Sequence, residues 1–459
     1  MNKSKNLILL LMLFLSFTAC QTIKNYDLAI VNAKILDVKT NAFLLNKTIL
    51  ISNGKIATIT DYKKFKATKT IDAKGKLLTP SFVDPHIHPT DVFGDYDKAP
   101  DYLPKDSLQI LRKKLSDEYL PFGTTSVMTM GQPENWLKDL LSWQKNPESD
   151  MVDFMVSGGA LISKDNRKPY IGHTEVTSPE LAKQMILEYH RLGIRHIKLY
   201  HRLKEPEFSA ITKIADSLNI RTYGHIGDFS PEYLTISETL KKGLKNYEHL
   251  ALIPNSIITS DDDWAKLDTQ FKNNFGELNN ESKIIEFFLE QFRFIKENKN
   301  AEMLAFMRNL RQNNATFSTT LHRLYEQFEP TFFTQRKDKS LTSKQIERCR
   351  ENFAIMMDYV KQMHDSGIEI RLGSDMPNGG KVNLSELIIL AKYGFKTDDI
   401  FKIASFNGAK AIGIENETGS IEEGKRANFI IWSKNPFENP QNFNSPFTVF
   451  KDGKMVGNN

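Results

Sequence analysis

Two histidines separated by a single residue stand in the stretch Ser81 to Asp91, "SFVDPHIHPTD". Side chains alternate between the two faces of an extended strand, so His86 and His88 are expected to point the same way, together with Asp84. Neutral imidazoles that meet on one face suit a divalent cation such as zinc, manganese or iron. Two solvated histidines at a polar strand end would give the same short pattern, so other residues must decide between these interpretations.

Further candidate ligands follow apolar runs that are typical of strands. His225 ends "IRTYGH", His249 ends "LKNYEH", and Asp375 follows "GIEIRLGS". Lys198 lies inside "GIRHIKLYH", where burial of an ammonium group is unfavourable. Singly, such residues are often structural, because many strand-end histidines only make a hydrogen bond. In a parallel barrel, however, all the carboxyl ends of the strands open onto one face, which would bring these residues together.

The elements that must position these residues follow two patterns. Short β-rich runs with Asn-Gly and Lys-Gly turns fill residues 27–78, and β-rich runs return at 419–457. Between them, at 79–418, short apolar strands alternate with longer amphipathic helices, as in a parallel α/β fold. We therefore expect a TIM-like (β/α)8 barrel at 79–418, with a small composite β-sandwich domain formed by both terminal segments.

The order and contexts of these residues resemble the amidohydrolase superfamily, loosely the branch of imidazolonepropionase-like enzymes and Xaa-Pro dipeptidases. The resemblance includes "DAKGKLLTPSFVDPHIH" and "SFNGAKAIGIENETGSIEEGKRANFII" and covers nearly the whole chain after its first residues. It implies metal ligands from barrel strands one, four, five, six and eight, namely His86, His88, Lys198, His225, His249 and Asp375.

The resemblance also implies that Lys198 reacts with carbon dioxide to form a carbamate, which would bridge two divalent metal ions. An uncarboxylated ammonium group has no lone pair to offer a metal. Zinc is the expected metal, with manganese, iron or cobalt as alternatives. Two such ions can lower the pKa of a bridging water from near 16 to around 7, and Asp375 would carry the proton of the resulting hydroxide to the leaving nitrogen. A lysine that extends out of the strand is the simpler alternative for Lys198.

The expected function is hydrolysis of an amide-type C–N bond in a dipeptide, an N-acyl amino acid or a cyclic amide. Mononuclear deaminases of the superfamily commonly carry a glutamate three residues after the strand-five histidine, where this chain has Asp228. This departure favours hydrolysis of an amide-type bond over deamination. A mononuclear deaminase or lactonase stays the alternative, and an inactive solute-binding lipoprotein is a third possibility. The same resemblance suggests substrate contacts from His173, Tyr200, His322 and Arg323, whereas Asp84 is expected to support a ligand rather than bind metal.

The first residues are typical of an exported lipoprotein. Lys3 and Lys5 precede an uncharged apolar run and the sequence "FTAC", which predicts a signal peptide at residues 1–19. Cys20 would then carry lipid and anchor the protein to a membrane, facing the periplasm or the cell surface. An ordinary signal that happens to contain a cysteine is the alternative. Cys349 is the other cysteine, so no internal disulfide is expected after lipidation.

The formal charge of +5 is not gathered into a basic stripe, and no Walker or dinucleotide motif occurs, so nucleic-acid binding is not expected. A homo-oligomer is compatible with this sequence.

An insertion is expected at about 255–314, where "SKIIEFFLEQFRFIKEN" has apolar residues at helical spacing. A helix packed on the barrel wall is the first interpretation. A lid, or a surface facing a partner or a membrane, is the alternative.

Overall fold

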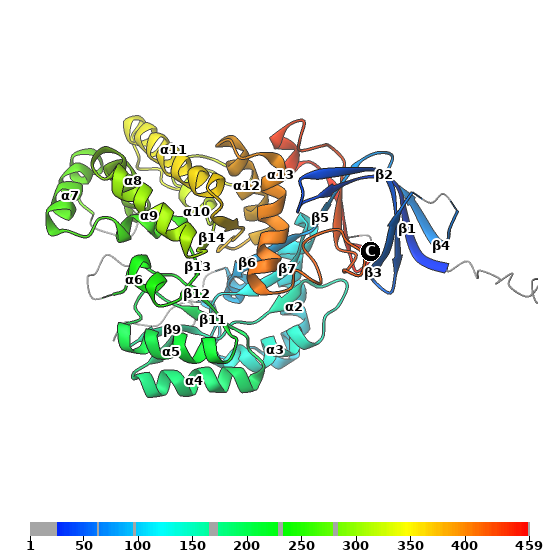
Figure 1. Cartoon of the computed structure of the whole chain (residues 1–459), viewed down its shortest axis with the longest axis horizontal. Helices are drawn as coiled ribbons and strands as arrows, with labels where there is room; N and C mark the ends of the chain where they lie inside the picture. Colours follow the sequence, from blue (N-terminus) through cyan, green and yellow to red (C-terminus); the bar gives the residue numbers. More distant parts are fainter. Residues whose placement is uncertain are drawn as a thin grey trace, which may run out of the picture.

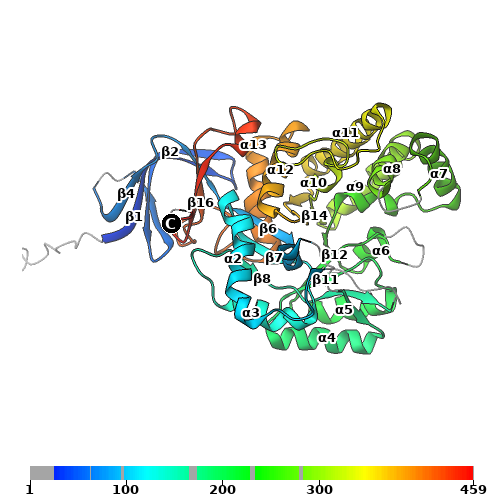
Figure 2. The same cartoon turned by 180° about the vertical axis from the view of Figure 1, so that it is seen from behind.

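The computed structural model describes residues 25–61, 64–94, 98–164, 173–227, 233–278 and 283–457. Figures 1 and 2 show a β-rich part at one end of the molecule and a larger α/β body that extends to the other end. The expected signal peptide at 1–19 and Cys20 lie outside the described residues, as does Asp228. Within the described ranges, no helix has both the length and the apolar character needed to cross a membrane.

The β-rich part is one sheet that combines strands from both ends of the chain. Within the described residues its order is β18-β17-β16-β5-β1-β2-β3, and β4 also pairs with β1. This is the composite domain expected from the terminal segments. Its strands are β1 (Asn25–Asp37), β2 (Ala42–Ser52), β3 (Lys55–Thr60), β4 (Lys66–Asp72), β5 (Leu77–Pro80), β16 (Phe429–Trp432), β17 (Phe447–Lys451) and β18 (Lys454–Met455).

The Asn-Gly turn between β2 and β3 shows how local sequence sets the register of this sheet. Asn53 and Gly54 have φ values of 52° and 72°. Two consecutive left-handed residues form the turn that suits the twist of a hairpin, and asparagine and glycine adopt this conformation at little cost. The hairpin aligns Ile49 and Ile51 with β3, and both side chains are buried in the core of the sheet.

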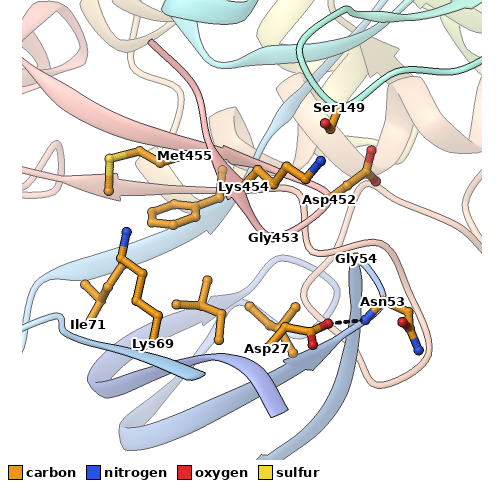
Figure 3. A pocket seen from close by; sticks show the side chains of 13 residues that line it. Asp27, Asn53, Gly54, Lys69, Ile71, Ser149, Asp452, Gly453, Lys454 and Met455 are labelled. Carbon is orange, nitrogen blue, oxygen red and sulfur yellow. Dashed lines mark hydrogen bonds between the residues drawn. The ribbon is translucent and has the colours of Figure 1, made fainter. Parts of the chain in front are cut away.

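A cavity of about 710 Å³ opens between the strands of this terminal sheet (Figure 3). Its floor is apolar, with Leu28, Ile51 and Phe450. At its rim, the carboxylate of Asp27 accepts a hydrogen bond of 2.6 Å from the backbone N–H of Asn53. Its lining comes from β1, β2, β4, β17, β18 and nearby turns, and so from outside the parallel strands of the body.

The α/β body contains a closed ring of parallel strands, as the alternating pattern predicts. Within the part of the chain that the structure describes, eight strands form it: β6 (Phe82–Ile87), β7 (Thr124–Thr129), β8 (Asp153–Met155), β11 (His196–Leu199), β12 (Arg221–Gly224), β13 (Asn246–Tyr247), β14 (Thr316–Ser318) and β15 (Glu369–Arg371). A bridge between Ser157 and His196 joins β8 to β11. The N–H of Asp375 donates to the carbonyl of His86 at 3.0 Å and joins the last strand to the first.

Two further parallel strands, β9 (Ala160–Ser163) and β10 (His173–Val176), extend the sheet beside β11. Helices connect and cover the barrel strands: α2 (Leu108–Tyr119), α3 (Leu137–Lys145), α4 (Pro179–Leu192), α5 (Glu205–Ser217), α6 (Ile236–Lys241), α10 (His322–Tyr325), α11 (Ser343–Asp365), α12 (Gly379–Lys392), α13 (Thr397–Lys402) and α14 (Gly408–Ile412).

Local signals set the ends of the longer helices. Helix α4 begins after Ser178, whose hydroxyl accepts the N–H of Leu181, and ends at Gly193, which has φ of 94°. Helix α11 begins with a capping box between Thr342 and Gln345. In both helices, side chains satisfy N–H groups that would otherwise lack a partner, which stabilises each helix start by about 1 kcal/mol.

The insertion forms α7 (Asp261–Phe275), α8 (Ile284–Asn298) and α9 (Asn300–Gln312), which follow a short 3-10 segment, η6 (Leu250–Ser256). The apolar stripe expected in α8 is buried, with Leu289, Phe292 and Ile295 in the main core. The buried carboxylate of Glu290 also binds Arg348 and Asn352 of α11. The stripe is therefore part of the core of the body, as the first interpretation of a packed helix has it, and these side chains do not form the exposed surface of the alternative.

Candidate metal centre

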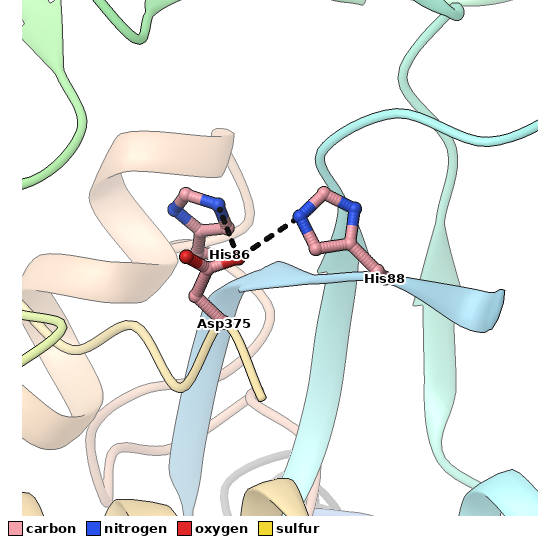
Figure 4. Close-up of side chains that lie close together, drawn as sticks. All are labelled: His86, His88 and Asp375. Carbon is pink, nitrogen blue, oxygen red and sulfur yellow. Dashed lines mark ion pairs between the residues drawn. The ribbon is translucent and has the colours of Figure 1, made fainter. Parts of the chain in front are cut away.

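His86, His88 and Asp375 meet where β6 and β15 end, at the mouth of the barrel (Figure 4). One ligand atom from each residue lies within 4.8 Å of the others. The Oδ1 atom of Asp375 lies 3.3 Å from Nε2 of His86 and 2.9 Å from Nε2 of His88. The structure thus brings together the first and last of the predicted ligands, which are 289 and 287 positions apart in sequence, by subtraction of 86 and 88 from 375.

His249 and His225 extend this group along the barrel mouth. The rings of His86 and His249 have centroids 5.0 Å apart, and those of His249 and His225 are 4.3 Å apart. Nδ1 of His249 lies 3.8 Å from Oδ2 of Asp375. Burial lowers the pKa of both His225 and His249 well below the usual value. Both rings are therefore neutral near pH 7, which is the state that binds metal.

Lys198 points from β11 into the same buried region. Its side chain is 1% exposed, and its Nζ atom has no hydrogen-bond partner among the residues that the structure describes. Burial lowers the pKa of Lys198 to about 8, although Glu248 and Asp375 act in the opposite direction. Burying an ammonium group without a counter-charge costs free energy. This lysine therefore fits a site in which the amine loses its positive charge or gains an anionic partner.

Three residues near the mouth have left-handed backbone conformations. The φ values are 65° for His249, 48° for Thr320 and 49° for Asp375. Such values are uncommon outside glycine, and Thr320 is β-branched, which makes its conformation strained. The strained conformation of Thr320 brings its Oγ1 atom to 3.0 Å from Nδ1 of His249.

Each of three histidines is held at Nδ1 by a group behind it. His86 Nδ1 lies 2.6 Å from a Glu248 oxygen, and His88 Nδ1 lies 3.3 Å from the carbonyl of Gly131. Thr320 serves His249 in the same way. Contacts of this kind orient the rings of metal-binding histidines and leave Nε2 for the metal.

The carboxylates near the histidines have different environments. Burial alone would raise the pKa of Asp375, but His86, His88 and His249 hold it well below the usual range. Burial raises the pKa of Asp84, which faces backbone and amide groups instead. The carboxylate of Asp84 accepts the N–H of His86 and the Nδ2 group of Asn383, both at 3.0 Å. Asp84 therefore ties the histidine strand to α12, while Asp375 lies among the imidazoles.

Of the residues suggested for substrate binding, Tyr200 and His173 lie beside the cluster. The ring centroid of Tyr200 is 4.6 Å from that of His225 and 4.4 Å from that of His173. His322 and Arg323 lie in α10. His322 is buried, with Nδ1 2.8 Å from the hydroxyl of Ser385, and Arg323 is exposed. The structure therefore does not show these two residues facing the histidines.

Glu248 and His201 also belong to this region, although the sequence patterns did not single them out. His201 packs against His225 with ring centroids 5.1 Å apart. Glu248 directly precedes His249, and strand alternation would put these neighbours on opposite faces. The positive φ of His249 breaks that alternation, so both side chains serve the same site. The available signal was a glutamate next to a strand-end histidine in an apolar strand.

This donor set fits divalent metal ions of the zinc, manganese, iron or cobalt type, which favour imidazole nitrogen and carboxylate oxygen. The histidines that can bind through Nε2 are oriented from behind, and an ionised carboxylate lies between them. The unpartnered Nζ atom of Lys198 fits conversion to a carbamate, which would exchange an unpaired cation for anionic oxygen ligands.

Comparisons with known proteins agree with this fold. Residues 265–456 match a model described as the amidohydrolase family, a range that includes Asp375 and follows the other candidate ligands. An adenine deaminase from Clostridium botulinum is 39% identical over 64 residues, or 14% of this chain. The chain thus spans only 11% of that deaminase.

Two longer matches are more distant. A guanine deaminase from Escherichia coli is 20% identical over 420 residues, covering 85% of this chain and 81% of that protein. The solved structure of a Xaa-Pro dipeptidase with bound methionine in the active site has a TM-score of 0.62 and 17% identity, with coverage of 94% and 99%. Residues 265–456 of this chain thus match the amidohydrolase family model, and solved proteins share the fold over 94% of the chain.

Proposed function

We propose that this protein is a metal-dependent hydrolase that cleaves an amide-type C–N bond with a binuclear centre at the barrel mouth. The observation that carries the proposal is Lys198, a buried lysine beside a cluster of imidazoles and a carboxylate. Within the described ranges its Nζ atom has no hydrogen-bond partner. His86, His88, His225, His249 and Asp375 would hold two divalent ions, and the amine of Lys198 would add to carbon dioxide, release a proton and leave a carbamate. This proposal gives a role to a group that is otherwise costly to bury.

When bound, the metal ions would lower the pKa of a water molecule and polarise the carbonyl group of the substrate. The residues of the chain supply the rest of the chemistry. Asp375 is kept ionised by the histidines around it and can accept a proton at its carboxylate and pass it to the leaving nitrogen. Tyr200 lies beside His225, and His173 packs against Tyr200, so both would contact the scissile group in this proposal.

The substrate class follows from the kinds of protein that share this fold, so we propose a dipeptide, an N-acyl amino acid or a cyclic amide. The Xaa-Pro dipeptidase among the solved relatives supports the first of these. The sequence matches to adenine and guanine deaminases favour the alternative, a mononuclear deaminase on the same barrel. A lactonase, or a solute-binding protein without activity, would use the same mouth.

Metal analysis separates these functions. Purified protein is expected to carry about two equivalents of divalent metal, because the six proposed ligands are enough to hold two ions. Chelation should abolish hydrolysis, and added zinc, manganese or cobalt should restore it. The measurement is elemental analysis together with a panel of dipeptides, N-acyl amino acids and lactams. About one equivalent with activity on purines would support the deaminase instead, and a protein that binds no metal would contradict both enzymatic proposals.

We also propose that the protein is an exported lipoprotein anchored through Cys20. Replacing Cys20 with alanine is expected to move the protein from the membrane fraction to the soluble fraction, because no helix in the described ranges can hold it in a bilayer. Fractionation with immunodetection measures this shift. Cys349→Ala is the matched control, since this second cysteine is buried in α11 and cannot be reached by lipid-transfer enzymes in the folded protein. Unchanged membrane association of the Cys20 variant would contradict the proposal.

A further inference from the structure

Glu248 joins the first candidate ligand to a buried arginine inside the barrel. One oxygen of Glu248, Oε2, lies 2.6 Å from Nδ1 of His86, and the two side chains are 0% and 1% exposed. The other oxygen, Oε1, contacts Nη2 of Arg371, whose side chain is 1% exposed. Arg371 is itself fixed, because its guanidinium donates to the Thr316 hydroxyl at 2.7 Å and to the Tyr247 carbonyl at 3.1 Å.

The direction of the hydrogen bond between Glu248 and His86 follows from charge. Oε1 of Glu248 pairs with the guanidinium of Arg371, which always carries its charge, so the carboxylate has a cationic partner at this oxygen. An ionised carboxylate can only accept hydrogen bonds, so Nδ1 of His86 must donate. When His86 is neutral it has one N–H, so this hydrogen bond places a lone pair on Nε2, the atom that would face a metal ion.

The backbone of this segment aims Glu248 into the barrel. The hydroxyl of Tyr247 reaches Thr239 of α6, at 3.2 Å, so the Tyr247 side chain faces the outer helix layer. Strand alternation then turns Glu248 to the interior, where it meets His86 and Arg371. A buried ion pair is weak evidence for stability, because desolvation offsets most of the attraction. The hydrogen bond between Oε2 of Glu248 and Nδ1 of His86 therefore points to a role beyond the stability of the barrel.

We propose that Glu248 is a positioning residue of the metal centre, which holds His86 with its proton on Nδ1 and its Nε2 lone pair toward the metal, while Arg371 holds Glu248. This inference rests on the proposed metal-dependent function. Glu248 directly follows β13 and lies 162 positions from the histidine that it orients. Glu248 touches neither substrate nor the reacting atoms in this role.

Glu248→Gln tests the proposal without changing side-chain size. A glutamine amide can donate or accept a hydrogen bond, so it can pair with His86 protonated at Nδ1 or at Nε2. The variant would therefore no longer favour the tautomer with a lone pair on Nε2. The affinity for zinc, titrated against a competing chelator in the full chain, is expected to fall by about 10- to 100-fold. In the metal-free protein, at a pH high enough for His86 to be neutral, ¹⁵N chemical shifts of the imidazole nitrogens should show His86 protonated at Nδ1 in the parent and a mixture of forms in the variant. His86→Asn identifies the signal.

Glu290→Gln is the matched control. Glu290 is also fully buried and also pairs with an arginine. Its partner is Arg348, and this pair joins α8 to α11 instead of contacting the histidines. This variant is expected to lose stability on thermal unfolding while it keeps the parent's zinc affinity and His86 signal. If Glu248→Gln binds zinc as tightly as the parent and leaves the His86 signal unchanged, the positioning role is wrong. If the parent itself binds no zinc, the proposed function fails instead, and the ¹⁵N measurement still reports on the hydrogen bond.

Discussion

Replacing Lys198 with alanine is expected to abolish hydrolysis and to remove about one of the two metal equivalents, because the bridging carbamate cannot form. The change also removes a buried, unpartnered amine, so the folded state should lose little stability through hydrogen bonding. A short carboxylic acid such as acetate or propionate, supplied at high concentration, should restore part of both the metal content and the activity by providing the missing carboxylate oxygens. Metal analysis and turnover, with and without the acid, measure this result.

A second buried lysine provides the control for that experiment. Lys451 is fully buried in β17 and pairs with Asp153 at 3.0 Å, in the terminal sheet. Lys451→Ala should lower the thermal unfolding temperature, because it leaves the buried carboxylate of Asp153 with one partner fewer, and it should keep both metals. Full activity of the Lys198→Ala protein, or failure of every short acid to restore metal, would show that Lys198 does not serve as the bridge.

Replacing Asp375 with asparagine is expected to lower turnover by about 10²-fold or more, while most metal affinity and substrate binding remain. Asparagine keeps the size and one oxygen of the side chain but cannot act as a base. The substitution also suits the backbone, since the φ of 49° at this position is one that asparagine adopts readily. The N–H of residue 375 can still donate to the carbonyl of His86 and keep the barrel joined. Loss of activity can then be attributed to the missing carboxylate.

Steady-state kinetics and metal analysis of the Asp375→Asn protein provide the measurement. Asp153→Asn is a suitable control, because Asp153 is a buried aspartate of β8 that pairs with Arg426 and Lys451. It should cost stability and leave turnover near that of the parent. If the Asp375→Asn protein keeps both metals and turns over at the parent rate, another group moves the proton, and Asp228 or His173 becomes the next candidate.

Local patterns were sufficient for the parts of this protein that depend on neighbouring residues. The two-residue alternation in "SFVDPHIH" predicts that His86 and His88 share a face, and both reach Asp375. The Asn-Gly pair at 53–54 predicts a hairpin because these two residues adopt left-handed conformations at little cost. The apolar spacing in 282–298 likewise predicts the helix α8.

Contacts between distant residues were decided by the tertiary structure. His322 and Arg323 follow a barrel strand, as ligands do, yet the turn after β14 buries His322 against Ser385 and leaves Arg323 exposed. Tyr200 comes to lie between His173 and His225 only because β10 and β9 continue the sheet beside β11. Sequence spacing does not report the direction of a loop, which depends on what the rest of the barrel leaves open.

The sequence by itself therefore determined the alternating elements, the order of the strand-end residues and the composite origin of the terminal sheet, since each follows from local periodicity and turn chemistry. Only the tertiary structure decided that Glu248 faces His86 and that His249 faces the same centre. Regular alternation forbids this for consecutive residues, and it becomes possible because His249 has a φ of 65°. Many other contacts of the barrel offset the local strain there, and no stretch of sequence records those contacts.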